Sequence, residues 1–202
     1  MSVSGSKALC LRLAGRRAGV TARELRVAGL HRETVRRLVA EGAVERVARG
    51  VYRRPDIGIG EHHGLAVAAV AVPRGVVCLL SALAFHGIGT QLPHEVWMAV
   101  DRRSRRPAES GLPLRIVRFS GRALTDGISV RRIEGRDVRV YDVPKTLADC
   151  FKYRHKIGLD AALEALREAW RAKKFAMDDL ERHAKTCRVS RVMRPYLEAL
   201  VT

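Results

Sequence analysis

Arginine side chains are concentrated in the stretch GLHRETVRRLVAEGAVERVARGVYRR, which runs from Gly29 to Arg54. A guanidinium group is planar, permanently charged and able to donate two parallel hydrogen bonds, which suits phosphate oxygens and guanine edges. The chemistry that this stretch could perform is therefore non-covalent recognition of a polyanion. The alternative is that the arginines only solvate a surface, as charged residues do on most exposed helices.

The elements that would position these arginines follow from apolar spacing and turn residues. The predicted elements are helices at 7–18, 22–28 and 32–41, followed by β-prone runs at 43–47 and 51–53. Thr21 and Glu24 match a capping box at the start of the second helix. Gly50 can adopt the positive φ that a tight hairpin requires. Three short helices and a hairpin predict an N-terminal winged helix-turn-helix.

The third predicted helix has an apolar face and a charged face. Its apolar stripe is Val35, Leu38 and Val39. With that stripe turned inward, a rotation of about 100° per residue leaves these residues pointing outward: Glu33, Arg36, Arg37 and Ala40. In a helix-turn-helix this is the helix that enters the major groove of DNA.

The predicted DNA contacts form three groups. Those expected to read or flank the major groove are Arg32, Thr34, Arg36 and Arg37. Those expected to reach the backbone or the minor groove from the hairpin are Arg46, Arg49 and Arg53. Those expected to bind phosphates at the start of the second helix are Thr21, Arg23 and Arg26. Glu33 opposes phosphate binding unless it accepts a hydrogen bond from a cytosine amino group.

Composition supports a polyanionic partner and a folded chain. The 202 residues contain 38 Lys and Arg against 21 Asp and Glu, a net charge of +17, and 47% are hydrophobic. Such a charge bears on partners rather than on the fold. Nucleic acid is the leading candidate, ahead of an anionic membrane surface or an acidic protein.

Cysteine spacing and hydropathy indicate a soluble, cytoplasmic protein. The four cysteines are far apart, so neither a metal finger nor a disulfide framework is expected, and buried reduced thiols are predicted. Basic residues interrupt the first apolar segment, which argues against a secretory signal. The longest apolar run, Gly64 to Pro73, is too short to span a membrane.

The rest of the chain predicts a second, α+β domain. A turn-rich joint at 55–60 suggests domains at 1–58 and 59–202. The predicted strands lie at 94–101, 113–120, 128–135 and 137–143, and the predicted later helices at 159–174, 178–185 and 189–200. Pro144 is expected to open another helix, capped by Asp142. The fold class expected is α+β: a winged helix-turn-helix followed by a small mixed sheet with C-terminal helices.

Enzyme motifs are not found in the sequence, and no catalytic residue, metal or cofactor is predicted. Adjacent His62 and His63 diverge on a helix and cannot easily face one ion. The segment VYDVPK, from Val140 to Lys145, has the acid and lysine of a nuclease but lacks the second acid of a magnesium site.

Three stretches resemble the AbiEi-like antitoxins of type IV (abortive infection) toxin–antitoxin systems. VTARELRVAGLHRETVRRLVAEGAVERVARGVYRRP is similar to the N-terminal winged helix of that family. LLSALAFHGIG and YDVPKTLADCFKYRHKIGLDAALEALREAW are similar to its C-terminal antitoxin domain, in the same order. The first motif alone is shared with many repressors, and the second pair makes the resemblance specific.

This resemblance implies a bacterial protein that represses its own operon by binding inverted repeats in the promoter. It further implies that the C-terminal domain counteracts a co-encoded nucleotidyltransferase-like toxin, without requiring a stable complex. The family's C-terminal motif falls on Ser81, His86, Lys145, Thr146 and Asp149. Their local interpretation is structural, with Asp149 as an ion-pair partner for Lys145. Two other functions stay open: a nuclease guided by the winged helix, which would use Asp142, and a ligand-sensing regulator.

Overall fold

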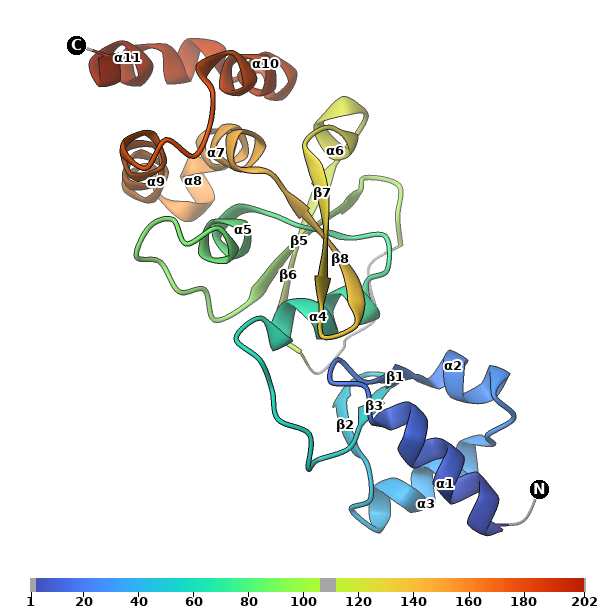
Figure 1. Ribbon diagram of the computed structural model, residues 1–202. Helices are drawn as coiled ribbons and strands as arrows, with labels where there is room; N and C mark the ends of the chain where they lie inside the picture. Colours follow the sequence, from blue (N-terminus) through green and yellow to red (C-terminus); the bar gives the residue numbers. More distant parts are fainter. Residues whose placement is uncertain (1–2, 106–111, 202) are drawn as a thin grey trace. The chain divides into compact units, whose positions relative to one another are not determined.

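The computed structural model describes residues 3–105 and 112–201 (Figure 1). The chain divides into two compact units. The first unit comprises Met1–Arg74, Arg105–Leu114 and Arg131–Val138, and the second comprises Gly75–Ser104, Arg115–Val130 and Arg139–Thr202. The first unit therefore extends past residue 58 and also includes residues 131–138, which come much later in the chain.

The first unit begins with three helices and three short strands. In chain order they are α1 (Val3–Ala14), β1 (Val20–Thr21), α2 (Ala22–Val27), α3 (Arg32–Ala40), β2 (Glu45–Ala48) and β3 (Val51–Arg53). The strands form an antiparallel sheet in the order β1-β3-β2, with Val20 opposite Tyr52 and Glu45 opposite Arg53. We call α1 to β3 the N-terminal module.

Local chemistry explains the boundaries of these elements. The predicted capping box is confirmed: the Thr21 hydroxyl accepts from the Glu24 amide, and the Glu24 carboxylate accepts from the Thr21 amide. Gly50 has φ of +73°, as the hairpin requires. The module's buried core is Cys10, Ala14, Val20, Leu25, Leu30, Val35, Leu38 and Val44. The first helix starts and ends four residues earlier than predicted, at Val3–Ala14 instead of 7–18.

The hairpin of the module packs on α4 (His63–Ala71) within the first unit. Val67 of α4 is buried against Ala48 and Val51 of the hairpin strands. Because α4 is apolar on several sides, it can cover the hairpin and still bury Ala66 and Ala68. The module therefore shares a small apolar cluster with residues beyond the predicted joint.

A mixed five-stranded sheet follows, in the order β6-β5-β4-β8-β7. Its strands are β4 (Val76–Val77), β5 (Val96–Asp101), β6 (Leu114–Phe119), β7 (Ile128–Ile133) and β8 (Arg136–Tyr141). Strand β4 pairs antiparallel with β5 and parallel with β8. Each of the four strands predicted in this region has a counterpart, whereas β4, which has only two residues within an apolar run, is not predicted from the sequence.

Helices pack with this sheet in the second unit (Figure 1). They are α5 (Leu79–Phe85), α6 (Arg122–Thr125), α7 (Val143–Lys152), α8 (Arg154–Ile157), α9 (Leu159–Arg171), α10 (Met177–Cys187) and α11 (Ser190–Val201). Helix α7 contacts α5, α9 and α10 and is the centre of the packing. It begins as predicted, with the Asp142 carboxylate accepting from the Lys145 amide and Pro144 in the first turn. The chain is thus α+β, as expected.

Candidate nucleic-acid interface

Helix α3 separates its apolar and basic residues as the sequence predicts. Val35 and Leu38 are buried, whereas Arg32, Arg36 and Arg37 are exposed. The Arg36 side chain is 79% exposed and that of Arg37 is 48% exposed. Three guanidinium groups therefore face solvent on nine residues of helix, while Thr34 at their flank is half-buried.

Arg36 and Arg37 form only long ion pairs with their acidic neighbours. Arg36 lies 3.9 Å from Glu33, and Arg37 lies 3.6 Å from Glu41. Exposed ion pairs of this kind are worth only about 0–1 kcal/mol. A phosphate or a base edge can therefore replace these carboxylates at little cost.

Helix α2 contributes two further exposed arginines, Arg23 and Arg26. Thr21, predicted to bind phosphate with them, uses its hydroxyl inside the capping box, where it donates to Glu24 at 2.8 Å. Its side chain is half-buried. The structure therefore presents the two arginines for binding, but commits Thr21 to the helix start.

Of the three hairpin arginines, two are exposed and one is turned inward. Arg46 and Arg49 are exposed, Arg49 next to the Gly50 turn. Arg53 is only 12% exposed, and its Nε donates to Glu45 at 2.6 Å. Its Nη1 also donates to the carbonyl of Ile57 at 3.3 Å. The cross-strand pairing of Glu45 with Arg53 turns this arginine inward, so it does not belong to the exposed set predicted from the sequence.

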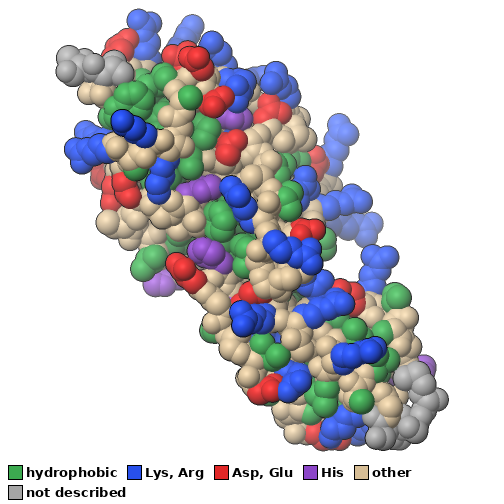
Figure 2. Space-filling view, in the orientation of Figure 1, with side chains coloured by type: hydrophobic (Ala, Val, Ile, Leu, Met, Phe, Trp, Pro, Cys, Tyr) green, Lys and Arg blue, Asp and Glu red, His purple; other side chains and the backbone are tan. Residues whose placement is uncertain are grey.

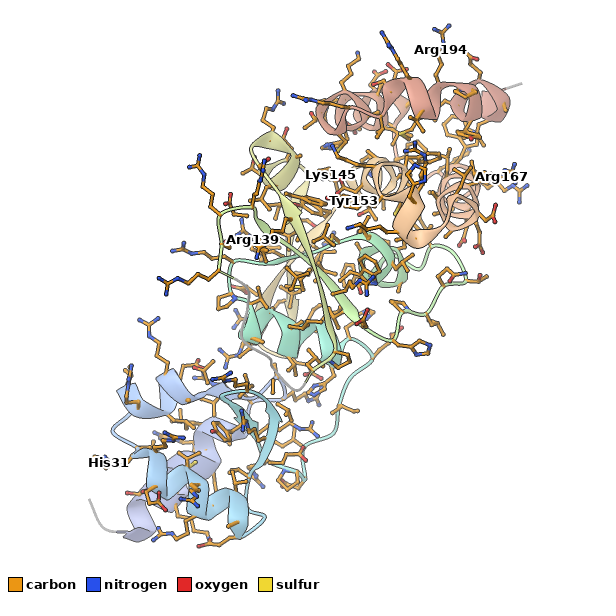
Figure 3. All side chains as sticks on the ribbon, turned by 180° about the vertical axis from the view of Figure 1, so that it is seen from behind. His31, Arg139, Lys145, Tyr153, Arg167 and Arg194 are labelled. Carbon is orange, nitrogen blue, oxygen red and sulfur yellow. The ribbon has the colours of Figure 1, made fainter. Side chains whose placement is uncertain are left out.

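A recess of about 530 Å³ is lined by residues of both α2 and α3. Its lining residues are Ala22, Arg23, Leu25, Arg26, Gly29, Leu30, His31, Arg32, Val35 and Tyr52. Three of the predicted arginines thus border one recess, with apolar residues at its base. Sequence reasoning missed His31, which precedes α3 without capping it, and Tyr52 of β3. Figure 3 shows His31 at the outer edge of the module.

One carboxylate in the module has a strongly altered acidity. Burial alone would raise the pKa of Glu24, but hydrogen bonds from Arg136 and Thr21 outweigh it and lower the pKa to about 2. Arg16 also contacts this carboxylate, at 3.2 Å. Glu24 is therefore ionised at neutral pH and its charge is compensated within the first unit.

The C-terminal motif residues lie inside the second unit. His86 donates from Nε2 to the carbonyl of Tyr141 at 2.7 Å, and Thr146 donates to the same carbonyl at 3.3 Å. The Ser81 hydroxyl accepts from the amide of Trp97 at 2.9 Å. These contacts tie α5 and α7 to the neighbouring strands, so the three polar groups serve the packing of the unit.

Lys145 and Asp149 form the predicted ion pair, but in the core. Their side chains are 0% and 1% exposed, with Nζ 2.5 Å from the carboxylate. The ammonium group also lies over the rings of Tyr141 and Phe119, at 4.1 and 4.8 Å from their centroids. Burial raises the pKa of Asp149 to about 6, partly opposed by Lys145. Figure 3 shows Lys145 inside the unit, whereas Arg167 and Arg194 point outward.

The other residues considered for metal binding or catalysis, and the cysteine thiols, make contacts within the fold or are buried. His63 lies 2.7 Å from Glu134 through Nδ1, and Asp142 caps α7. Within residues 3–105 and 112–201, no three His, Cys, Asp or Glu residues are grouped to hold a metal ion. All four cysteines are free and buried, as predicted, and burial raises the pKa of each thiol.

Surface charge alone does not locate an interface. Figure 2 shows Lys and Arg side chains spread over both units on the face that it displays. What distinguishes the module is that its exposed arginines lie on two successive helices and one hairpin, and that three of them border one recess. No helix in the described parts of the chain has the length and apolar character of a membrane span.

Comparison with known proteins finds a match, which falls on the N-terminal module. A family model described as transcriptional regulator, AbiEi antitoxin, matches residues 11–55. No curated protein matches the chain. The matched segment begins within α1 and ends just after β3, so it covers the exposed arginines of the module. The resemblance to AbiEi-like antitoxins is therefore confirmed over residues 11–55, which match that family of transcriptional regulators.

Proposed function

We propose that the protein is a cytoplasmic, DNA-binding autorepressor and type IV antitoxin, without enzymatic activity of its own. Its N-terminal module would bind inverted repeats in its own promoter. The remaining domain, 59–202 as predicted from the sequence, would counteract a co-encoded nucleotidyltransferase-like toxin. The observation that supports this best is the exposed arginine face of α3 inside the segment that matches the AbiEi antitoxin regulators.

The order of elements supports a winged helix-turn-helix. Helix, strand, two helices and a two-stranded hairpin follow one another, and β1 joins the hairpin to complete a small sheet. In this arrangement α2 and α3 are the helix-turn-helix, and β2 and β3 are the wing. Helix α3 would enter the major groove.

The contacts follow from exposure. Arg32, Arg36 and Arg37 would reach base edges or flanking phosphates from α3. Arg23 and Arg26 would bind phosphates from the far side of the shared recess, whose apolar base suits sugar or a thymine methyl group. The wing would use Arg46 and Arg49. Thr34 would flank the groove, while Arg53 and Thr21 would support the module rather than touch DNA.

Binding to duplex DNA from the region upstream of the reading frame tests this proposal. Fluorescence anisotropy should show specific binding by the wild type. Replacing Arg36 and Arg37 by alanine should cost about 1–3 kcal/mol for each arginine that hydrogen-bonds a base. Arg167→Ala with Arg171→Ala is the matched control, because it removes two exposed arginines from α9. Equal affinity of both double variants for the duplex would refute the assignment of α3.

The antitoxin role needs an experiment that leaves the chain whole. A variant that begins at Gly60 would lack the hairpin that packs on α4. If such a variant did not neutralise the toxin, the loss of this packing would explain the result as well as the loss of an antitoxin role. Full-length Arg36→Ala/Arg37→Ala should still rescue cells that express the downstream toxin, although it no longer represses the promoter. Loss of rescue with intact protein levels would show that neutralisation depends on DNA binding.

A further inference from the structure

The turn between β7 and β8 has an unusual residue at its first position. It consists of Glu134 and Gly135, with φ of +49° and +78°. Two-residue hairpin turns with positive φ at both positions strongly prefer Asn, Asp or Gly first. A glutamate is strained there, and strain of this kind persists where surrounding contacts hold it.

Those contacts lie within the first unit. The Glu134 side chain is 5% exposed and its Oε2 lies 2.7 Å from Nδ1 of His63. Its Oε1 accepts from the amide of Gly60 at 2.8 Å. The glutamate thus fixes the turn to the start of α4 and to the segment before it.

Two residues further on, Arg136 holds the start of α2. Its Nη1 donates to Glu24 at 2.9 Å, and its Nη2 donates to the carbonyl of Gly19 at 2.6 Å. Nη2 also lies 3.2 Å from the second Glu24 oxygen. The Arg136 side chain is 19% exposed. A guanidinium that spans a carboxylate and a carbonyl fixes both in direction as well as in distance.

Both groups that Arg136 holds bear on the DNA-binding surface. Glu24 belongs to the capping box that starts α2 and adjoins Arg23. Gly19, with φ of +80°, lies so near Tyr52 that an added Cβ would come within 2.8 Å of its carbonyl oxygen. Arg136 therefore sits where it can set the direction of α2 relative to β3, and it neutralises an acid beside the phosphate-binding arginines.

We propose that Arg136, through Glu24 and Gly19, is a positioning residue for DNA binding by α2, with the Glu134–Gly135 turn as its support. This inference rests on the proposed DNA-binding function. It assigns part of that function to a residue outside the segment that matches the AbiEi regulators. The role is distinct from phosphate binding, because Arg136 is mostly buried and already bound to a carboxylate.

The first test compares Arg136→Gln with Arg131→Gln in the full chain, on the same upstream duplex. Both remove one charge from the same hairpin, but Arg131 is exposed. Arg136→Gln should weaken binding about tenfold, and Arg131→Gln should weaken it far less. The dependence of log affinity on log salt should keep its slope. A slope reduced by about one in Arg136→Gln would mean that Arg136 itself binds a phosphate and would overturn the positioning role.

A double-mutant cycle separates positioning from general stability. Arg23→Ala should cost less affinity in the Arg136→Gln background than in the wild type, because α2 is already misplaced, whereas Arg49→Ala in the wing should cost the same in both. Additive effects at both positions would reject the proposal. If Arg136→Gln does not fold, Arg136→Lys takes its place in the cycle, since it retains the charge but not the bidentate geometry.

Failure of this inference can be told from failure of the proposed function. If the wild type does not bind the duplex at all, the proposed function fails. If the wild type binds and Arg36→Ala/Arg37→Ala does not, while Arg136→Gln binds like Arg131→Gln, only the positioning role is refuted.

Discussion

Helices α3 and α7 carry basic residues on similar amphipathic patterns, and the structure uses them in opposite ways. In α3 the arginines are exposed and their carboxylate neighbours lie 3.6–3.9 Å away. In α7 the lysine is fully buried, with a carboxylate four residues on and two aromatic rings around it. A basic residue on a helix is therefore available to a partner molecule only where the fold leaves it without a close internal partner.

The largest expected effect concerns the buried pair of α7. Lys145→Ala should lower the free energy of unfolding by about 3–5 kcal/mol, because it leaves Asp149 buried without its ion-pair partner. Urea unfolding followed by circular dichroism measures this. The double variant Lys145→Met/Asp149→Leu should recover much of the loss, and a single variant as stable as the wild type would contradict the assigned role of the pair.

A smaller effect concerns the pH dependence of stability. Glu24 and Asp149 each pair with a basic side chain, but their pKa values are shifted in opposite directions. The pKa of Glu24 is lowered from 4.5 to about 2, so its stabilising contribution is complete above pH 4.5 and is lost as pH falls towards 2. The pKa of Asp149 is raised from 3.8 to about 6, so its contribution has the opposite sign and falls as pH rises through 6.

Glu24→Gln isolates the first of these carboxylates. At pH 7 it should lower stability by roughly 1 kcal/mol after allowance for solvent screening, because this side chain is 34% exposed. The difference from the wild type should shrink below pH 4.5. A difference that stays constant from pH 7 to pH 3 would mean that the carboxylate charge is not what Arg136 stabilises.

The next effect is at the end of α10, a neighbour of α7. Arg188 adopts φ of +59° as the C-cap, a left-handed conformation that favours glycine. Arg188→Gly should raise the free energy of unfolding by about 0.5–1 kcal/mol. Thermal unfolding would show this as a higher Tm, and a lower Tm would imply that the Arg188 side chain makes an interaction worth more than the strain.

The smallest effect is expected in α3 itself. Arg36→Ala/Arg37→Ala should change the free energy of unfolding by no more than about 0.5 kcal/mol, because exposed residues with loose ion pairs contribute little to stability. Urea unfolding checks this beside the Lys145 variants. A loss comparable to that of Lys145→Ala would remove the distinction between the two helices.

Local patterns predicted much of the module from the sequence. The exposed face of α3 follows from the spacing of its apolar residues, and the start of α2 follows from the capping box at Thr21 and Glu24. Periodicity and capping act over a few residues, so they can be read from one sequence. The same holds for Gly50 in the hairpin and for Asp142 before α7.

What the sequence did not reveal depends on contacts between distant residues. Arg53 is turned inward by the strand register that places it opposite Glu45. Arg136 meets Glu24 from 112 residues away. The pairing of Lys145 with Asp149 could be predicted from their spacing, but its burial depends on Phe119 and Tyr141, which come from two strands. Strand register and long-range packing cannot be predicted from the local spacing of residue types.

The most direct measurement of the central claim is the base preference of α3. Wild type and Arg36→Ala should be titrated against the upstream operator duplex and a set of duplexes that each change one base pair. If the arginine face of α3 reads the major groove, the wild type should discriminate against several changes, and Arg36→Ala should lose about 1–3 kcal/mol of discrimination at one or two adjacent positions. An unchanged preference profile at every position would contradict the claim.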